Sequence, residues 1–585
     1  MKTWKKRLAI LMAMTALLSA LAACGSPAAS SVGDSPAEAT STVESAEPPT
    51  GAIPPDAPQA PAASAQEAPS GLESSAAPQA AERVSYELPL FEDPEHFTYW
   101  TILQGMDESN STFLFWQRLA QETGIDVEFV DAPEETATEK YNLMVSSGDL
   151  ADVICEKSLS HGSSTVCPYN GGYGQAIADG VYMNLTDIIP EQCPNYWSFL
   201  LEDPSLYRDL TLDDGTLYCF AGIMDEPYGP NQGAWVRTDM MKQAGVTEIP
   251  TTEDGWLALW RAMKSANVVE QPTRASNLGD LYPNIAEAYG TTATSNFLID
   301  LSDGSIFYDV ISDSYRAYLE YFRTVYSDGL IDADFYSVSE TSMQDIDGSL
   351  IATYECVLGA ANMMTGNGIE MAAAPAVHLS NYDVAQPKLI SYNDWNARIT
   401  NGLWCCVSAN TEKLDPILKW FDFLYSDYGI QVSNFGFDEG VSYEIVDGAM
   451  QLTPAMLDRD ENMIVGRMQY TMKEGPTYMY SKIELPVSSD FINTSYHTWG
   501  DFDKDAAIYS TLPAGVSLND EENAVIANHM SDIETYVATI TMQWMTCAEP
   551  LTDESWTEYV TYIQNSGIDE VIAAYQSAYD RYLRK

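Results

Sequence analysis

The chain is poor in basic residues and in histidine. Lys and Arg together number 28 against 85 Asp and Glu, so the formal net charge is −57 at pH 7. No basic stripe is available to neutralise phosphates, which argues against a nucleic-acid partner. The five histidines show no metal-ligand spacing, and we predict no metal and no other cofactor. An acidic excess of this kind more often serves solubility than a binding site.

Sequence signatures of the common enzyme classes are also missing. The chain contains no H-E-x-x-H, no G-x-S-x-G and no phosphate-cradling G-x-x-x-x-G-K pattern. Two carboxylates at glycosidase distance carry no information in a chain with 85 acidic residues. We therefore expect a binding protein rather than an enzyme, with a polysaccharide-active enzyme as the alternative.

Long apolar runs are confined to the start of the chain. A cationic stretch precedes the apolar run Leu8–Ala22, which is too short to span a bilayer of roughly 30 Å comfortably. Residues 1–23 resemble a bacterial lipoprotein signal peptide, because Leu21-Ala22-Ala23 is followed by Cys24. The resemblance implies lipidation of Cys24 and attachment to the extracellular face of the cell membrane through this anchor alone.

Aromatic residues are missing from the next segment. Residues 24–85 are rich in Pro, Ala, Ser and Glu, and the first aromatic residue after Trp4 is Tyr86. Such a segment buries too little apolar surface to offset the loss of backbone entropy. We predict a disordered tether that holds the folded part away from the membrane.

Cysteines form no recognisable disulfide framework. Eight cysteines follow Cys24 at scattered spacings, and a chain of this size does not need disulfides to fold. Cys405 and Cys406 lie in an apolar, strand-like run, and we expect them to be buried free thiols.

The folded part, from about residue 86, is too long for one core. Its start alternates strand and helix, with strands near 97–103, 125–130 and 151–156 and helices near 111–124 and 141–144. This order predicts a parallel, doubly wound α/β sheet, in which ligands bind beyond the carboxyl ends of the strands. Further amphipathic helices are predicted at 312–330, at 415–429 and in several segments after Asn519.

Six segments in order resemble one family. They are YNLMVSSGDLADVI (141–154), DDGTLYCFAGI (213–223), WVRTDMMKQAGVTEIPTTEDGWLALWRAMK (235–264), VYSDGLIDADF (325–335), VSANTEKLDPILKWFDFLYSDYG (407–429) and GVSYEIVDG (440–448). Together they are similar to the family 1 extracellular solute-binding proteins of ABC importers, and in particular to the lipoprotein branch that handles oligosaccharides. The resemblance implies a monomeric, two-lobed periplasmic-binding-protein-like fold of type II that delivers a solute to ABC permease subunits.

The same resemblance implies where the chain passes between the lobes. Crossings are expected near 220–223, near 373–377 and after Gly436. The first lobe would hold 86–221 and 376–437, and the second lobe 222–375 and 438–585. Many relatives carry a calcium-loop-like stretch after the Pro-Thr-Thr helix, but residues 265–279 here lack a run of acidic ligands. The stretch 501–512 also fails as an EF-hand, because Ala506 and Leu512 replace the turn glycine and the bidentate glutamate.

Most candidate ligand-binding residues are aromatic residues outside helical stripes together with their polar neighbours. Gln104 and Glu156 are chosen only because they lie at the ends of predicted strands. Aromatic faces stack on sugar rings, while Asp, Asn, Gln and Arg bond the hydroxyls. For Trp395 a position in the core remains an equal alternative. Peptides or a lipid-linked solute, and a surface sensor or adhesin on the same fold, remain open. The predicted ligand-binding residues are Gln104, Glu156, Trp235, Arg237, Tyr354, Glu355, Asn393, Asp394, Trp395, Arg398 and Trp499.

Overall fold

The computed structural model describes the chain between Arg83 and Lys585, and these residues belong to one compact unit. The signal peptide, Cys24 and nearly all of the tether lie outside the described residues. Within the described part, no helix is both long and apolar enough to cross a membrane. Also outside the description are residues 104–108, 134–135, 157–168, 170–171, 228–231, 276–277, 279–280, 282–284, 338–352, 358–367, 382–386, 392–395, 457–466, 473–475, 484–485, 487–488, 502–503 and 514.

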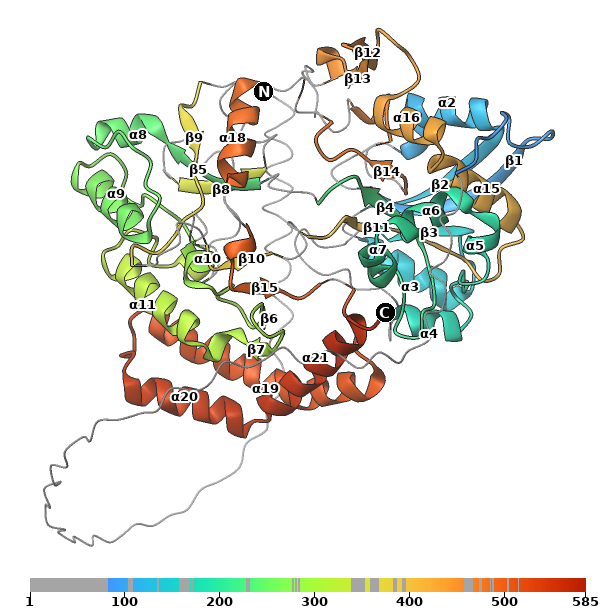
Figure 1. Ribbon diagram of the computed structural model, residues 1–585. Helices are drawn as coiled ribbons and strands as arrows, with labels where there is room; N and C mark the ends of the chain where they lie inside the picture. The colour runs from blue at the N-terminus through green and yellow to red at the C-terminus, as the bar shows by residue number, and fades with distance from the viewer. Residues whose placement is uncertain are drawn as a thin grey trace, which may run out of the picture. The chain divides into compact units, whose positions relative to one another are not determined.

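A six-stranded sheet organises the first hydrophobic core, which we call the first core (Figure 1). The strand order is β14-β4-β11-β3-β1-β2. β1 pairs in parallel with β2 and β3, so the predicted β-α-β-α-β start is confirmed. β11 is antiparallel to both β3 and β4. The strands are β1 Glu95–Leu103, β2 Ile125–Pro133, β3 Val153–Glu156, β4 Phe220–Met224, β11 Ile399–Val407 and β14 Tyr478–Met479.

Helices of the first core pack their apolar sides on this sheet. In α2, Phe115 and Leu119 are buried, and the helix ends at Gly124, whose φ of 72° suits a left-handed cap. The helices are α2 Leu114–Thr123, α3 Ala137–Ser147, α4 Gly172–Ala178, α5 Ile189–Gln192, α6 Pro194–Glu202, α7 Pro204–Asp209, α15 Leu414–Leu424 and α16 Asp427–Phe435.

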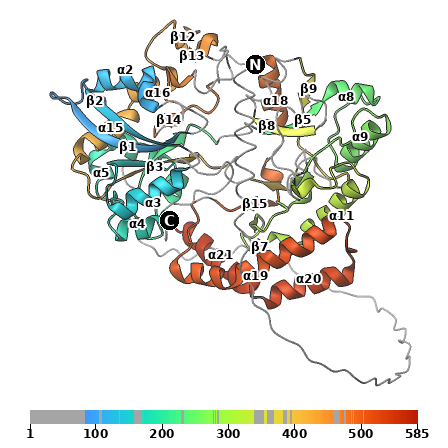
Figure 2. The same cartoon turned by 180° about the vertical axis from the view of Figure 1, so that it is seen from behind.

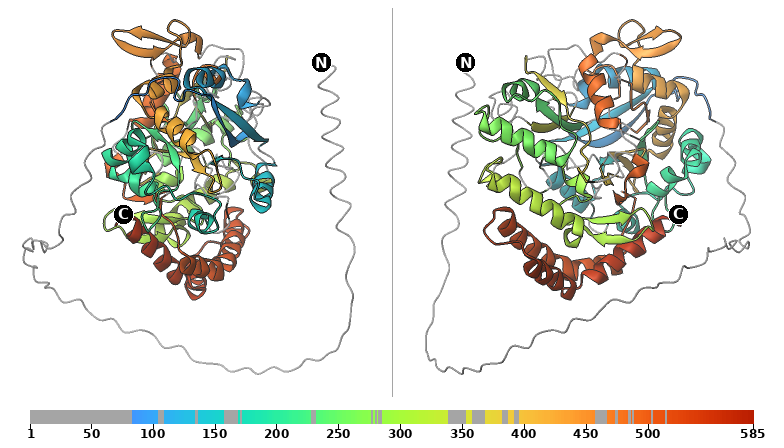
Figure 3. Two further views of the ribbon diagram at one scale, coloured as in Figure 1. Left: turned by 90° about the vertical axis from the view of Figure 1, so that its right-hand side faces the viewer. Right: turned by 60° about the vertical axis from the view of Figure 1, so that its left-hand side comes forward.

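The second core contains two smaller sheets, with strand orders β10-β15-β6-β7 and β8-β5-β9 (Figure 2). Their strands are β5 Gln232–Arg237, β6 Phe297–Asp300, β7 Ile306–Tyr308, β8 Thr353–Val357, β9 Met371–Ala373, β10 Leu389–Ile390 and β15 Tyr509–Thr511. The helices are α8 Thr238–Gln243, α9 Glu253–Ser265, α10 Ile285–Tyr289, α11 Asp313–Ser327, α18 Asp490–Gly500, α19 Asp520–Met545, α20 Asp553–Asn565 and α21 Ile568–Tyr582. The last three helices lie together at the C-terminal end of the chain, in red in Figure 3.

The helix predicted at 312–330 is confirmed as α11, which begins after the cap residue Ser312 and buries Tyr318 and Phe322. The helix predicted at 415–429 is two helices, because Ser426 caps a new helix by accepting from the main-chain nitrogen of Gly429. Gly429 therefore lies inside α16 and not at a helix end. A Cβ on it would lie 1.9 Å from the carbonyl oxygen of Phe423, so this close turn between the helices requires glycine.

Two of the three expected crossings lie elsewhere in the chain. The first follows β4. The second is at the start of β11, because residues as far as Leu379 are buried in the second core and β10 belongs to its sheet. The third follows β14, which pairs with β4, so the boundary after Gly436 is corrected to about residue 480. The main-chain pairing of β10 and of β14, two strands of two residues each, decides both corrected boundaries. Strands this short are too short to show an alternating pattern in the sequence.

The described cysteines agree with the expectation of free thiols. Cys155, Cys193, Cys219, Cys405 and Cys406 are buried and form no disulfide among the described residues, so the prediction that Cys405 and Cys406 are buried thiols is confirmed. Cys547 is free and exposed.

The N-terminal segment of the described chain is held by a buried carboxylate. Asp422 is 0% exposed and accepts hydrogen bonds from the Tyr86 hydroxyl (2.7 Å), the Asn195 amide nitrogen (3.0 Å) and the main-chain nitrogen of Tyr196 (2.9 Å). Burial raises the pKa of Asp422 to about 6, although these hydrogen bonds favour the charged form. Val84 donates its main-chain N–H to the Asn195 side chain, so the folded part begins by residue 84 rather than 86.

Replacing Tyr86 by Phe should destabilise the fold. The ring keeps its packing on Phe423, but the carboxylate of Asp422 loses one donor while it stays buried. We expect a loss of about 1–3 kcal/mol in the free energy of unfolding above pH 7, measured by urea denaturation. Tyr169→Phe is the matched control, since Tyr169 donates to the exposed Asp179 at 2.6 Å. Equal losses in the two variants would contradict this role of Tyr86.

Candidate functional site

The three crossings meet at one edge of the six-stranded sheet. β1, β3, β4 and β14 run in the same direction, so their carboxyl ends share this edge, and the antiparallel β11 begins there. Ligands of open α/β sheets bind outside the carboxyl ends of the strands. The edge at which a ligand is expected is therefore also the edge at which the described chain passes between the two cores.

Main-chain hydrogen bonds tie the crossing segments to one another. The N–H of Ile223 donates to the carbonyl of Thr477 at 3.0 Å. The N–H of Met224 donates to the carbonyl of Arg398 at 2.6 Å, and the next N–H along the chain, of Asp225, donates to the carbonyl of Met479 at 2.9 Å. Since adjacent residues of one crossing bond the other two crossings, these segments form one hinge.

Arg398 has a structural position at this hinge. Its Nε donates to the carbonyl of Met224 at 2.9 Å, and its Nη1 donates to Asp203 at 3.2 Å. Burial alone would raise the pKa of Asp203, but hydrogen bonds from Ser205 and the hydrogen bond and charge of Arg398 lower it, which favours the carboxylate form of Asp203. The guanidinium predicted to bind ligand is thus used to hold β4 to the start of β11.

The exit after β14 is fixed by amide and carboxylate groups. Asn434, on α16, donates to the carbonyl of Tyr478 at 2.8 Å and accepts from the N–H of Tyr480 at 3.1 Å. Asp225 accepts from the N–H of Ser481 at 2.8 Å. The chain therefore leaves the first core at a defined position.

Half-exposed polar and aromatic side chains follow this exit. Lys482 pairs with Glu226 at 2.8 Å, and the hydrogen bond to Glu226 raises the pKa of Lys482. Tyr480 is 38% exposed, and partial burial raises the pKa of Tyr480 and of Tyr496 on α18. None of these residues was predicted, because nothing in their local sequence separates them from ordinary surface residues.

Trp235 and Trp499 lie inside a small aromatic cluster. Trp235 is 0% exposed and is stacked on Phe491 at 5.0 Å, with Trp499 edge-on at 4.7 Å. Trp499 is 6% exposed and donates its indole N–H to the carbonyl of Ala234 at 3.2 Å. Both indoles thus pack between α18 and the β8-β5-β9 sheet, and neither presents a ring face to a solute in this structure.

Arg237 is also engaged within the protein. It is 7% exposed and its Nε and Nη2 donate to the two carboxylate oxygens of Asp239 at 2.8 and 2.6 Å. The hydrogen bonds from Arg237 lower the pKa of Asp239, so both partners are charged. This bidentate pair holds the start of α8 and engages the Nε and Nη2 edge of the guanidinium.

The remaining predicted ligand residues lie on strands or outside the described residues. Tyr354 and Glu355 lie within β8, opposite Trp235 and Ala234, rather than after a strand. Glu156 ends β3 opposite Trp404 of β11, at the ligand edge of the sheet. Gln104, Asn393, Asp394 and Trp395 lie outside the described residues.

Trp404 is an aromatic residue near this edge that the sequence did not single out. Its ring packs edge-on against Tyr173 at 5.9 Å and Tyr218 at 6.3 Å, and these two tyrosines stack at 4.2 Å. Trp404 is 3% exposed, and its indole N–H has no hydrogen-bond partner among the described residues. In the sequence, Trp404 adjoins Cys405 and Cys406 in an apolar run, and such a run predicts a core strand rather than a ligand contact.

Comparisons with known proteins agree with this architecture. No protein-family model matches the chain. The chain is 22% identical over 509 residues to the fructooligosaccharide ABC transporter substrate-binding protein FusA of Streptococcus pneumoniae, which covers 80% of this chain and 87% of that protein. The sequence resemblance therefore spans both cores.

Solved structures show the same fold. A solute-binding protein from Bifidobacterium longum infantis, described as binding HMO, gives a TM-score of 0.62 at 16% identity, covering 85% of this chain and 100% of that one. The alginate-binding protein AlgQ2 gives 0.61 at 18% identity, covering 84% and 99%. The chain has the fold of the ABC-importer solute-binding proteins. The expected two-lobed, periplasmic-binding-protein-like fold is thus confirmed.

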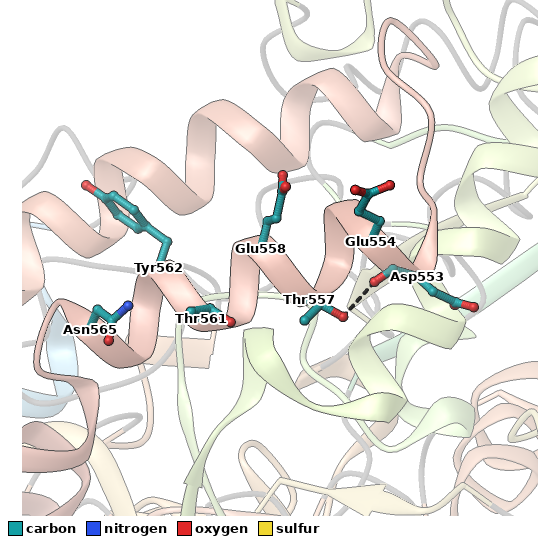
Figure 4. Close-up of a pocket in the computed structure, with 7 residues that line it drawn as sticks. All are labelled: Asp553, Glu554, Thr557, Glu558, Thr561, Tyr562 and Asn565. Atoms are coloured by element: carbon teal, nitrogen blue, oxygen red, sulfur yellow. Dashed lines mark hydrogen bonds between the residues drawn. The ribbon is translucent and has the colours of Figure 1, made fainter. Parts of the chain in front are cut away.

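A shallow pocket on the second core lies away from the hinge. All seven residues that line it come from one side of α20 (Figure 4). Since one helix supplies every contact, the pocket offers no opposing wall to enclose a solute. Its lining residues are Asp553, Glu554, Thr557, Glu558, Thr561, Tyr562 and Asn565.

Calcium should not stabilise this protein. The described residues contain no group of three His, Cys, Asp or Glu side chains able to hold a metal ion. A ligand raises the melting temperature only if it binds the folded state more tightly than the unfolded state. Since the stretches 265–279 and 501–512 lack the ligands of a calcium loop in sequence, we expect equal melting temperatures with EDTA, calcium and magnesium, measured by differential scanning calorimetry. A rise with calcium beyond that with magnesium, reversed by EDTA, would contradict the sequence-based expectation.

Proposed function

We propose that this chain is a lipid-anchored extracellular protein that captures an oligosaccharide between its two cores and delivers it to an ABC permease. The sequence relation to FusA, which extends over 80% of the chain, is the observation that carries the proposal. The hinge supports it, because three crossings side by side let two cores turn relative to each other without separating. A solute that contacts both cores would favour the closed arrangement by its differential contacts.

The solute is proposed to be neutral. A uronate would need a cationic partner, and the two arginines best placed in sequence to supply one, Arg237 and Arg398, are paired with Asp239 and Asp203. Aromatic stacking and hydrogen bonds from amides and carboxylates suit uncharged sugar rings. The proposed contacts are Gln104, Glu156, Tyr354, Glu355, Asn393, Asp394 and Trp395.

The first test is a calorimetric screen with the chain from Gly25 to Lys585. We expect kestose or another neutral oligosaccharide to bind, an oligouronate not to bind, and no new reducing ends to form on incubation. Binding of peptides alone would overturn the proposal. Release of reducing ends would favour the alternative of a polysaccharide-active enzyme.

A second test separates ligand contact from packing with two tryptophan variants. Trp395→Ala should weaken solute binding about tenfold, near 1.4 kcal/mol, with the melting temperature nearly unchanged. Trp235→Ala, in the aromatic cluster, should instead cost about 3–5 kcal/mol of stability. If Trp395→Ala melts much earlier and binds normally once folded, Trp395 is a core residue and the contact assignment fails.

A further inference from the structure

The last helix of the chain begins in the second core and ends against the first core. Ile568 and Val571, near the start of α21, are buried in the second core. Tyr582, at its end, is 1% exposed and donates its hydroxyl hydrogen to Asp209 at 2.6 Å. Leu206 and Leu210, which flank Asp209, are buried in the first core. This contact joins the two cores without a covalent crossing.

Two cations reinforce the contact. Arg581 Nε donates to Asp213 at 2.5 Å, and Lys585 Nζ lies 3.2 Å from the other oxygen of the same carboxylate. Lys585 also donates to the carbonyl of Thr211 at 2.7 Å, and its side chain is 4% exposed. Charge-assisted hydrogen bonds of this geometry are stronger than exposed ion pairs.

Residues of the second core orient the Arg581 guanidinium that binds Asp213. Its two terminal nitrogens donate to both oxygens of Glu522 at 2.5 and 2.6 Å, and one also donates to the carbonyl of Ser517 at 3.0 Å. Glu522 is fixed in turn by the capping box that it forms with Asn519 at the start of α19. Because the guanidinium is preorganised, little side-chain entropy is lost when it binds the first core.

Close packing surrounds Asp209. A Cβ on Gly515 would lie 2.8 Å from Cα of Asp209 and 3.0 Å from the ring of Tyr582, so the chain passes this point without spare room. The guanidinium of Arg208 lies over the Tyr582 ring at 5.5 Å.

Burial raises the pKa of Asp209 to about 6, while the Tyr582 hydroxyl and the charges of Arg208 and Lys585 lower it. Asp209 is therefore largely ionised at neutral pH.

One short helix connects this contact to the hinge. Asp203 caps the start of α7 and accepts from Arg398 at the hinge, while Asp209 ends the same helix. Six helical residues span about 9 Å. Figure 1 shows the C-terminal end of the chain below α7.

We propose that Arg581, Tyr582 and Lys585, bound to Asp209 and Asp213, form a C-terminal strut that is a fourth, non-covalent element of the hinge. The strut lies near the crossings, so it restricts how far and in which direction the cores turn without blocking closure. It depends on the two-core fold and not on the identity of the solute.

The test measures the distance between the cores without solute. Nitroxide labels are placed on the exposed Cys547 of the second core and on Ser146→Cys, on α3 of the first core, with Cys167 and Cys356 replaced by Ser. Double electron–electron resonance then gives the distance distribution in the chain from Gly25 to Lys585. In the Asp209→Asn/Asp213→Asn variant we expect the distribution to widen roughly twofold, because the cores sample more orientations.

Asp553→Asn is the matched control. It breaks the 2.5 Å pair between Arg316 and Asp553, which joins two helices of the second core, and should leave the distribution unchanged. An unchanged width in the folded double variant would overturn the proposal. If the double variant does not fold, Asp213→Asn alone keeps the Tyr582 contact and the Arg581–Glu522 pair. An unchanged width in that variant would also overturn it. Failure of every sugar to bind would leave this result intact and count only against the proposed function.

Discussion

Pairing of β4, β11 and β14 at one sheet edge is the constraint on which the rest of the structure depends. Each strand belongs to the first core and leads to or from the second. Successive N–H groups of Ile223, Met224 and Asp225 bond the two other crossings, so the segments cannot slide past one another. Hinge rotation about such an edge is the closure motion of periplasmic binding proteins.

Positive charge is scarce in this chain, and much of it holds segments together. Arg398 joins β4 to the start of β11, Arg237 fixes the start of α8, and Arg581 links the last helix to both cores. Each of these cations pairs with a carboxylate, Asp203, Asp239 or Asp213. An acidic chain that uses its arginines in this way keeps few for an anionic ligand, which agrees with a neutral solute.

Amino-acid composition does not show which aromatic residues pack inside the protein and which contact a ligand. Trp235 and Trp499 stand beside polar residues in the sequence, as ligand-stacking residues do, yet Trp235 stacks on Phe491 and Trp499 packs edge-on against Trp235. The indole N–H of Trp499 is satisfied by a main-chain carbonyl, so its burial has no polar cost. Local polarity in a sequence therefore does not distinguish an exposed aromatic face from one covered by a distant helix.

Local patterns in the sequence predicted the strands β1, β2 and β3 and the apolar stripe of α11, because strand and helix periodicity and turn residues are local properties. The sequence also carried enough ordered motifs to indicate the solute-binding fold. The tertiary structure alone decided that the chain returns to the first core at β11 and leaves it at β14, since strands as short as Tyr478–Met479 are defined by their partners. It also decided that Arg398 holds the hinge and that Tyr582 reaches Asp209, 373 residues away in the chain. Contacts of such separation depend on how two cores pack, and no local pattern of residues encodes them.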